Sequence, residues 1–367
     1  MRCIGNEKVI AFSKNIETLL LHCICLSFMF TTLDFTVGYW SLRLIVISFS
    51  FILLLYNIQI QSRFIISCFS LLFLTVCLCV VNQHSLHCLL LLSSLLILSR
   101  ISLKKIVLLN LSYLLSTAFF IIFFSKVGVI QPNYKIIKTG ELVDIYCFGN
   151  PNRLASFMFA VLLFLSLFLI GKGFYFFGNT IGLAFSFYIY SRTGCRTALV
   201  SCAVQTLVYF LILPIKKFKI TFFLLKKLAS TLPILLLLFS FLLARRSSSG
   251  LFLMIDLILG RGAYLKHFVD SYSLAALFVG VNFNTDAPFD NSYLYILFST
   301  NIVLYYAFYR FVSSHINRFS QNAIFAYTPV LIGLFAYGMT ESLLGYYSYP
   351  AFAFFFVILK AAQEVKS

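Results

Sequence analysis

The chain has 367 residues, of which 61% are hydrophobic and only 11% are charged. A soluble domain of this length would need far more charge to cover its surface, so the composition excludes a soluble globular protein. The apolar segments are continuous and lack the alternation of apolar and polar residues typical of transmembrane β-strands. The sequence therefore predicts an all-α, polytopic integral membrane protein that forms a single membrane domain over residues 1–367.

Segments of about 20 apolar residues, the length that crosses a bilayer, occur about twelve times. In chain order the candidate spans are Ile16–Leu33, Val37–Tyr56, Phe64–Val81, Ser85–Ser99, Ile106–Ser125, Leu154–Ile170, Phe174–Tyr190, Thr197–Pro214, Leu228–Ala244, Ser292–Val312, Ala323–Thr340 and Leu344–Leu359. The fourth is the shortest, and whether it crosses fully stays open.

The charge distribution predicts the orientation of these spans. Placing the N-terminus inside puts most of the 28 basic residues on inner turns and most of the 11 acidic residues on outer ones. Because cytoplasmic loops carry an excess of Lys and Arg, we expect both termini in the cytoplasm. The net charge of +17 is then mostly a topology signal, and the cluster Lys216–Lys227 is expected to be a solvated loop facing headgroups. Nucleic acid is not an expected partner, because no basic soluble domain is present to hold it.

Two outer segments are unusually long, 126–153 and 245–291. The second contains apolar patches such as Leu251–Leu259 and Leu274–Val281, so it is expected to fold as short helices lying on the membrane face. Long structured loops in an otherwise minimal protein are usually functional. A purely structural anchor would not need them.

The string SRTGCRTALVSC, residues 191–202, carries two arginines at the outer end of the predicted eighth span. A spacing of four would place Arg192 and Arg196 on one helical face. Two permanent charges at the lipid boundary need an anionic partner, and a diphosphate suits the planar guanidinium groups. The alternative is that both side chains snorkel to lipid headgroups.

Further outer residues could join such a site. Arg153 starts a span in GNPNRLASF, and Arg261 lies between two glycines in LGRGAYLKH, where the backbone could approach a ligand closely. The carboxylates of Asp290, just before the tenth span, and Glu341, closing the eleventh, could each accept a proton from a sugar hydroxyl. Asp286 and His267 are secondary candidates for this base. Each acid could instead be an ordinary loop residue or a counter-ion of an arginine.

The sequence lacks the motifs of several kinds of enzyme. It contains no Walker A loop, no dinucleotide-binding fingerprint followed by a strand, no D-x-D pair and no G-x-S-x-G string. We therefore expect no soluble cofactor and no metal, and the energy for any group transfer must arrive with the substrate. The ten cysteines mostly lie inside apolar runs, and a disulfide between Cys147 and Cys195 is the weaker of two interpretations of that pair.

The outer arginines, SRTGCRTAL opening one span, GRG in a large outer loop and DNSYLYIL opening the next span resemble the O-antigen polymerases of the Wzy type, over roughly Gly140 to Pro350. The wider group includes the O-antigen ligases. In that comparison Arg192 or Arg196 matches the arginine after a serine, and Arg261 matches the arginine after a glycine. The ligases carry histidine and asparagine where this chain has Asp290 and Asn291, which favours a polymerase.

The resemblance implies a GT-C-like glycosyltransferase of the bacterial inner membrane. It would join undecaprenyl-diphosphate-linked oligosaccharide repeats at the periplasmic face, using one lipid-linked glycan as donor and another as acceptor. Arg192, Arg196, Arg261 and Arg153 would hold the diphosphate, and Asp290 or Glu341 would be the base. Whether a chain-length regulator protein binds stays open. The alternatives are an O-antigen ligase and a flippase or exporter of lipid-linked sugars.

Overall fold

The structure is a computed structural model of the whole chain. It describes residues 16–30, 41, 43, 90, 94, 101–130, 134–136, 142–145, 148, 151–170, 172, 175–215, 217–246, 250, 254, 262–272, 275–281, 291–341 and 348–361. The predicted spans Val37–Tyr56, Phe64–Val81 and Ser85–Ser99 lie almost wholly outside the described residues.

The described chain is a bundle of apolar helices. After a first helix at Ile16–Phe30, the elements are α5 (Leu103–Lys126), β1 (Tyr134–Ile136), β2 (Leu142–Asp144), α6 (Pro151–Leu169), α7 (Tyr175–Thr193), α8 (Arg196–Ile215), α9 (Lys219–Arg246), α11 (Gly262–Ser271), α12 (Ala276–Val279), α13 (Ser292–Ser299), α14 (Ile302–Ile316), α15 (Gln321–Thr340) and α16 (Tyr349–Ala361). Within these residues, five helices are long and apolar enough to cross a membrane, namely α5, α6, α8, α9 from Ile220, and α15. The chain is therefore an α-helical protein with the character of a membrane protein.

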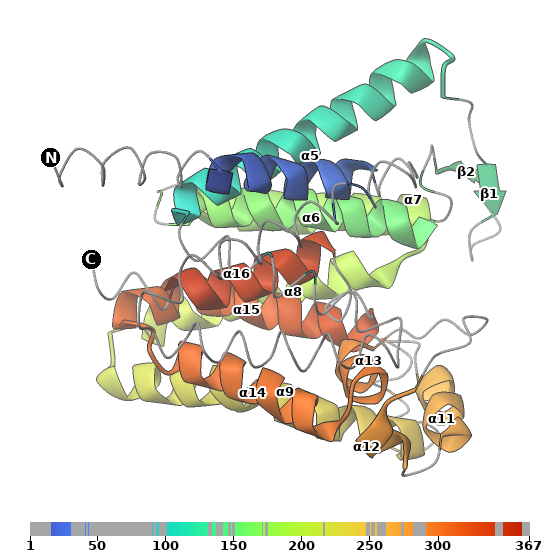
Figure 1. Cartoon of the computed structure of the whole chain (residues 1–367). Helices are drawn as coiled ribbons and strands as arrows, with labels where there is room; N and C mark the ends of the chain where they lie inside the picture. The colour runs from blue at the N-terminus through green and yellow to red at the C-terminus, as the bar shows by residue number, and fades with distance from the viewer. Residues whose placement is uncertain are drawn as a thin grey trace, which may run out of the picture.

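The helices lie side by side, with the short elements gathered at one end (Figure 1). Short turns join α6 to α7, α7 to α8 and α8 to α9, so these helices alternate in direction. The end that carries β1, β2, α11 and α12 also carries the start of α6, the turn between α7 and α8, and the C-terminus of α9 (Figure 1). We call it the loop end. In the predicted topology it is the outer end.

The first helix fixes the direction of the chain relative to its two neighbours. Lys105 Nζ donates to Thr18 Oγ1 at 2.8 Å, and His22 Nδ1 lies 3.0 Å from the Tyr113 hydroxyl, so Ile16–Phe30 runs parallel to α5. The Phe28 ring packs 4.5 Å from the ring of Tyr349 at the start of α16, which therefore runs the opposite way. Ile16 and Ala361 thus lie at the same end of the bundle, away from the loop end (Figure 1). The predicted order of spans requires both relations.

The helix α15 forms the centre of the bundle, and most of its residues are buried. Its face toward α8 has Gly333, where an added Cβ would lie 2.9 Å from Gln205 Cβ and 3.1 Å from the Ser201 carbonyl oxygen. Its face toward α6 has Tyr337, whose ring stacks on Phe159 at a centroid distance of 4.4 Å. Such close packing fixes α15 against both neighbours.

The predicted tenth span, Ser292–Val312, is wrong as one continuous helix. The chain breaks at Thr300 and Asn301 into α13 and α14, and the Asn301 side chain accepts from Leu304 N to cap α14. The break is covered by the segment after α12, because Val281 N donates to the Phe298 carbonyl oxygen at 2.7 Å. Gly280, at φ +79°, lies so close to the Thr300 carbonyl oxygen that no side chain fits there. Unwound backbone inside such a bundle is tolerated where protein covers it.

Two further expectations need correction. The cluster Lys216–Lys227 was expected to be a loop, but α9 already begins at Lys219, because the apolar residues between the lysines allow the helix to start there. The fold was expected to be all-α, yet the outer segment 126–153 contains β1 and β2, which form an antiparallel pair in which Tyr134 faces Asp144. The short helices expected within 245–291 are present as α11 and α12.

Candidate functional site

The string SRTGCRTAL forms the turn between α7 and α8, and Gly194 is the residue that makes this turn. Gly194 has φ +67°, and its N–H donates to the Tyr190 carbonyl oxygen at 2.8 Å, which ends α7 with a left-handed residue. The expectation that Arg192 and Arg196 share one helical face is therefore wrong. Arg192 lies in the last turn of α7, and Arg196 is the first residue of α8.

The two arginines also have different surroundings. Arg192 is exposed, and its Cζ lies 5.6 Å from the ring centre of Tyr188, which is itself exposed. This arrangement is typical of an arginine at the membrane surface. Arg196 is also exposed but directly precedes Thr197, which is buried against another segment.

Three segments far apart in the sequence meet at Glu341. The Thr197 hydroxyl of α8 donates to Glu341 Oε1 at 3.0 Å, and the Ser292 hydroxyl at the start of α13 donates to the Glu341 carbonyl oxygen. Glu341 ends α15 and is only 6% exposed. The strings SRTGCRTAL, DNSYLYIL and YGMTESLLG, each singled out from the sequence, therefore form one cluster at the loop end of the bundle.

Asn291, the residue after the predicted base Asp290, has a structural role in this cluster. Its side-chain oxygen accepts from Tyr293 N and Leu294 N, which caps α13. Its side-chain nitrogen donates to Ser240 Oγ at 3.0 Å and to the Met339 carbonyl oxygen at 3.3 Å. Asn291 thus ties α13 to α9 and α15 one turn from Glu341.

The loop end also gathers other arginines. Arg153 lies in the first turn of α6, and Ser156 in the same turn accepts a hydrogen bond from the Tyr337 hydroxyl, four residues before Glu341. Arg245 and Arg246 end α9, five and six residues beyond the Ser240 that bonds Asn291. All three arginines are exposed. All three arginines therefore belong to helix ends at the loop end of the bundle, where Glu341 is buried.

The other predicted site residues lie outside the described residues or on a separate element. Arg261, Asp286 and Asp290 lie outside the described residues. His267 is exposed on α11, where the neighbouring Phe268 packs against Phe298 at 5.0 Å. Cys195 is a thiol, not half of a disulfide, and donates to Thr197 Oγ1 at 3.6 Å, while Cys147 lies outside the described residues. Among the residues described, no group of three or more His, Cys, Asp or Glu side chains could hold a metal ion.

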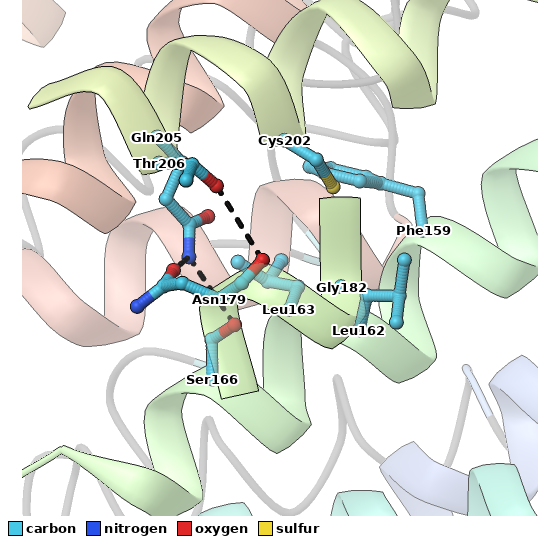
Figure 2. Close-up of a pocket in the computed structure, with 9 residues that line it drawn as sticks. All are labelled: Phe159, Leu162, Leu163, Ser166, Asn179, Gly182, Cys202, Gln205 and Thr206. Carbon is cyan, nitrogen blue, oxygen red and sulfur yellow. Dashed lines mark hydrogen bonds between the residues drawn. The ribbon is translucent and has the colours of Figure 1, made fainter. Parts of the chain in front are cut away.

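A second polar cluster lies deeper in the bundle, around a small cavity (Figure 2). Gln205 Nε2 donates to Asn179 Oδ1 at 2.8 Å and to Ser166 Oγ at 3.2 Å, joining α6, α7 and α8. Gln205 is eight residues from Thr197, or about 12 Å along α8, so the two clusters are separate. Such interhelical hydrogen bonds contribute about 0.6 kcal/mol each in membranes, and these side chains bond mainly to one another. We interpret them as contacts that hold the helices in register.

Thr197 and Ser292 did not stand out from the sequence, although the strings that contain them did, and Asn291 was noted only beside Asp290. Small hydroxyl and amide side chains at the first residues of helices were the available signal. Their contact with Glu341 and Met339 depends on tertiary packing between segments nearly 50 to more than 140 residues apart.

Comparisons of this chain with models of known families, with curated proteins and with solved structures found no match. The resemblance to the O-antigen polymerases therefore rests on the short motifs in the sequence.

Proposed function

We propose that this protein is an integral-membrane glycosyltransferase that polymerises undecaprenyl-diphosphate-linked oligosaccharide repeats at the periplasmic face of the bacterial inner membrane. The observation that supports the proposal is the meeting of Thr197, Ser292 and Glu341 at the loop end. Thr197 and Ser292 come from strings that resemble the O-antigen polymerases, and Glu341 is a carboxylate predicted from the sequence as a base. The site would lie where the predicted topology puts the periplasm. Lipid-linked glycan would be both donor and acceptor.

The chemistry needs a base for the acceptor and positive charge for the leaving group. Glu341 would accept the proton of the acceptor hydroxyl as its oxygen bonds to the anomeric carbon of the donor. The bond between that carbon and the phosphate oxygen would break, releasing undecaprenyl diphosphate. This leaving group is a weak base, so fixed charge from Arg196 and Arg153 would serve it better than a proton. Charge placed in this way is often worth about 3–4 kcal/mol. Asp290 and Arg261 keep the roles proposed for them from the sequence.

The identity of the basic residues at the two ends of the bundle supports a phosphate ligand. Among the described residues, exposed cations at the loop end are mainly arginines: Arg153, Arg192, Arg196, Arg245 and Arg246. Those at the opposite end are mainly lysines: Lys104, Lys105, Lys172, Lys217 and Lys227. Either type satisfies the positive-inside rule or interacts with headgroups. Only arginine offers a planar fork that binds phosphate oxygens in pairs, so its concentration at one end favours a diphosphate there.

Two rival functions use the same lipid-linked substrate. An O-antigen ligase would transfer the chain to a lipid A core, and Asp290 in place of the histidine before Asn291 counts against it. A flippase would need a polar path through the bundle. The polar cluster of Gln205, Asn179 and Ser166 inside the described helices is closely paired around a small cavity, so it does not supply such a path.

Deleting the gene in its source strain and separating the lipopolysaccharide on a gel tests the proposal. We expect core bearing a single repeat and no ladder. Bare core with long lipid-linked chains at the periplasmic side would mean a ligase, and bare core with single units trapped inside would mean a flippase. An unchanged ladder would contradict all three functions.

A further inference from the structure

The carboxylate of Glu341 lies at a position that is unfavourable for a negative charge. Glu341 directly follows α15, and its N–H donates to the Tyr337 carbonyl oxygen at 3.0 Å. The C-terminal end of a helix carries partial negative charge from its carbonyl groups, which repels a carboxylate. The side chain is also buried, so water cannot offset this repulsion. An ionised base at this position needs donors from other elements.

The donors come from the N-termini of two helices. Thr197 is the second residue of α8 and bonds the carboxylate, while Ser292 is the first residue of α13 and bonds the main-chain carbonyl of Glu341. Both helices therefore direct their partially positive ends toward Glu341. Of the two contacts, only that of Thr197 acts on the carboxylate itself.

The hydrogen-bond direction at Thr197 is fixed by the carboxylate, which has no hydrogen when ionised and can only accept. A threonine hydroxyl has one hydrogen to donate and can accept others. The Cys195 thiol donates to Thr197 Oγ1 at 3.6 Å, and Thr197 Oγ1 lies 3.0 Å from Glu341 Oε1. The hydroxyl hydrogen is thus directed at the carboxylate. Cys195 and Thr197 are both nearly fully buried, 6% and 3% exposed, so they are held in this geometry.

We propose that Thr197 is the positioning residue for the base: its hydroxyl holds Glu341 Oε1 and so sets the plane of the carboxylate and the direction of its second oxygen. This inference rests on the proposed function. A base must lie within hydrogen-bond reach of the proton that it removes, so a rotated carboxylate would slow the transfer while leaving the lipid-linked donor bound.

The test compares Thr197→Val, which keeps the shape of the side chain without its hydroxyl, with Thr197→Ser, which keeps the hydroxyl. The assay is elongation of lipid-linked repeats, extracted from the deletion strain, by purified protein in liposomes. We expect Thr197→Val to lower kcat roughly 10- to 100-fold with KM for the donor unchanged, because a hydrogen bond to a charged group is lost. We expect Thr197→Ser to keep most of the activity.

The matched control is Thr117→Val on α5. Thr117 is also fully buried, but its hydroxyl donates only to the Tyr113 carbonyl oxygen of its own helix. Its loss should leave kcat unchanged. Should Thr197→Val not accumulate, Thr197→Ala and Thr197→Ser replace that comparison, because they differ only by the hydroxyl.

The possible outcomes distinguish a failure of the positioning role of Thr197 from a failure of the proposed polymerase function. Normal kcat in Thr197→Val, or equal loss in the Val and Ser variants, would overturn the positioning role while Glu341→Gln remained inactive. Full activity of Glu341→Gln would instead show that Glu341 is not the base. No elongation by the unaltered protein would contradict the proposed polymerase.

Discussion

At the scale of single residues, Glu341 is the most specific candidate, because Thr197 bonds its buried carboxylate and Ser292 bonds its main-chain carbonyl oxygen. We predict that Glu341→Gln, which keeps the shape and removes the charge, lowers chain elongation by roughly 10²- to 10⁴-fold. Protein levels in the membrane should not change. The control is Asp270→Asn on the exposed face of α11, which should elongate normally. Equal ladders from both variants on a lipopolysaccharide gel would contradict the role of Glu341.

The two arginines of SRTGCRTAL predict different outcomes now that they are known to lie on separate helices. Arg196 precedes the Thr197 that contacts Glu341, whereas Arg192 stacks on the exposed ring of Tyr188. We expect Arg196→Ala to lose roughly 10²- to 10³-fold in turnover, as when one preorganised donor is removed. Arg192→Ala should lose much less, since a headgroup contact is weaker and replaceable.

The same elongation assay separates the two variants. A larger loss from Arg192→Ala than from Arg196→Ala would mean that the diphosphate lies over the end of α7, not over the start of α8.

At the scale of elements, the packing of α8 against α15 positions the site, because Thr197 lies on α8 and Glu341 directly follows α15. Gly333→Ala would place a methyl group 2.9 Å from Gln205 Cβ and 3.1 Å from the Ser201 carbonyl oxygen. We expect the helices to be forced apart at a cost of about 1–3 kcal/mol. The result should be a lower unfolding temperature in detergent and reduced elongation.

Gly182→Ala on α7 is the control for this change. An added Cβ there meets no atom within 4 Å, and alanine favours helix over glycine by about 0.8–1.0 kcal/mol. Its unfolding temperature should stay the same or rise. Equal behaviour of the two variants would show that α8 and α15 are not as closely packed as described.

The break between α13 and α14 gives a second prediction at this scale. Gly280→Ala would combine strain at φ +79° with a collision against the Thr300 carbonyl oxygen, so the segment after α12 should leave the break. Gly128→Ala is the comparison, because Gly128 also has a positive φ, +81°, but has open space around it. Each variant has backbone strain of about 1–3 kcal/mol from its positive φ. We expect the larger loss of stability and elongation from Gly280→Ala, because its methyl group also meets the Thr300 carbonyl oxygen. No difference would mean that this contact does not hold α13 in place.

The elements differ in how well the sequence predicts them. The boundaries of α6, α8 and α15 lie within three residues of the predicted spans, because long apolar runs with polar ends determine them. The break at Thr300 was not predicted, because it depends on Gly280 and Val281, which are distant in sequence. The end of α7 could have been predicted, since Gly194 inside SRTGCRTAL is a recognised signal for a helix C-terminus.

The residues of the candidate site also differ in whether the sequence alone predicts them. Glu341 and Arg196 were named from the sequence, because charged residues at the ends of apolar runs need a partner. Thr197 and Ser292 were not, because hydroxyl residues are common in membrane helices and only their contacts distinguish these two.

At the scale of the whole molecule, the predicted orientation puts the loop end in the periplasm. Alkaline phosphatase, which folds only in an oxidising compartment, provides the test. We expect a fusion after Gly128, just beyond α5, to be active, and one after Phe218, in the turn between α8 and α9, to be inactive. The reverse pattern would place Glu341 on the cytoplasmic side and would contradict polymerisation at the periplasmic face.

The most direct measurement is elongation by the purified protein in liposomes, supplied only with single lipid-linked repeats extracted from the deletion strain. We predict longer lipid-linked chains and one released undecaprenyl diphosphate for each new bond, with no ATP or nucleotide sugar added, and no such products from Glu341→Gln. Single repeats left unchanged by a folded, unaltered protein would contradict the proposal that this chain is a glycan polymerase.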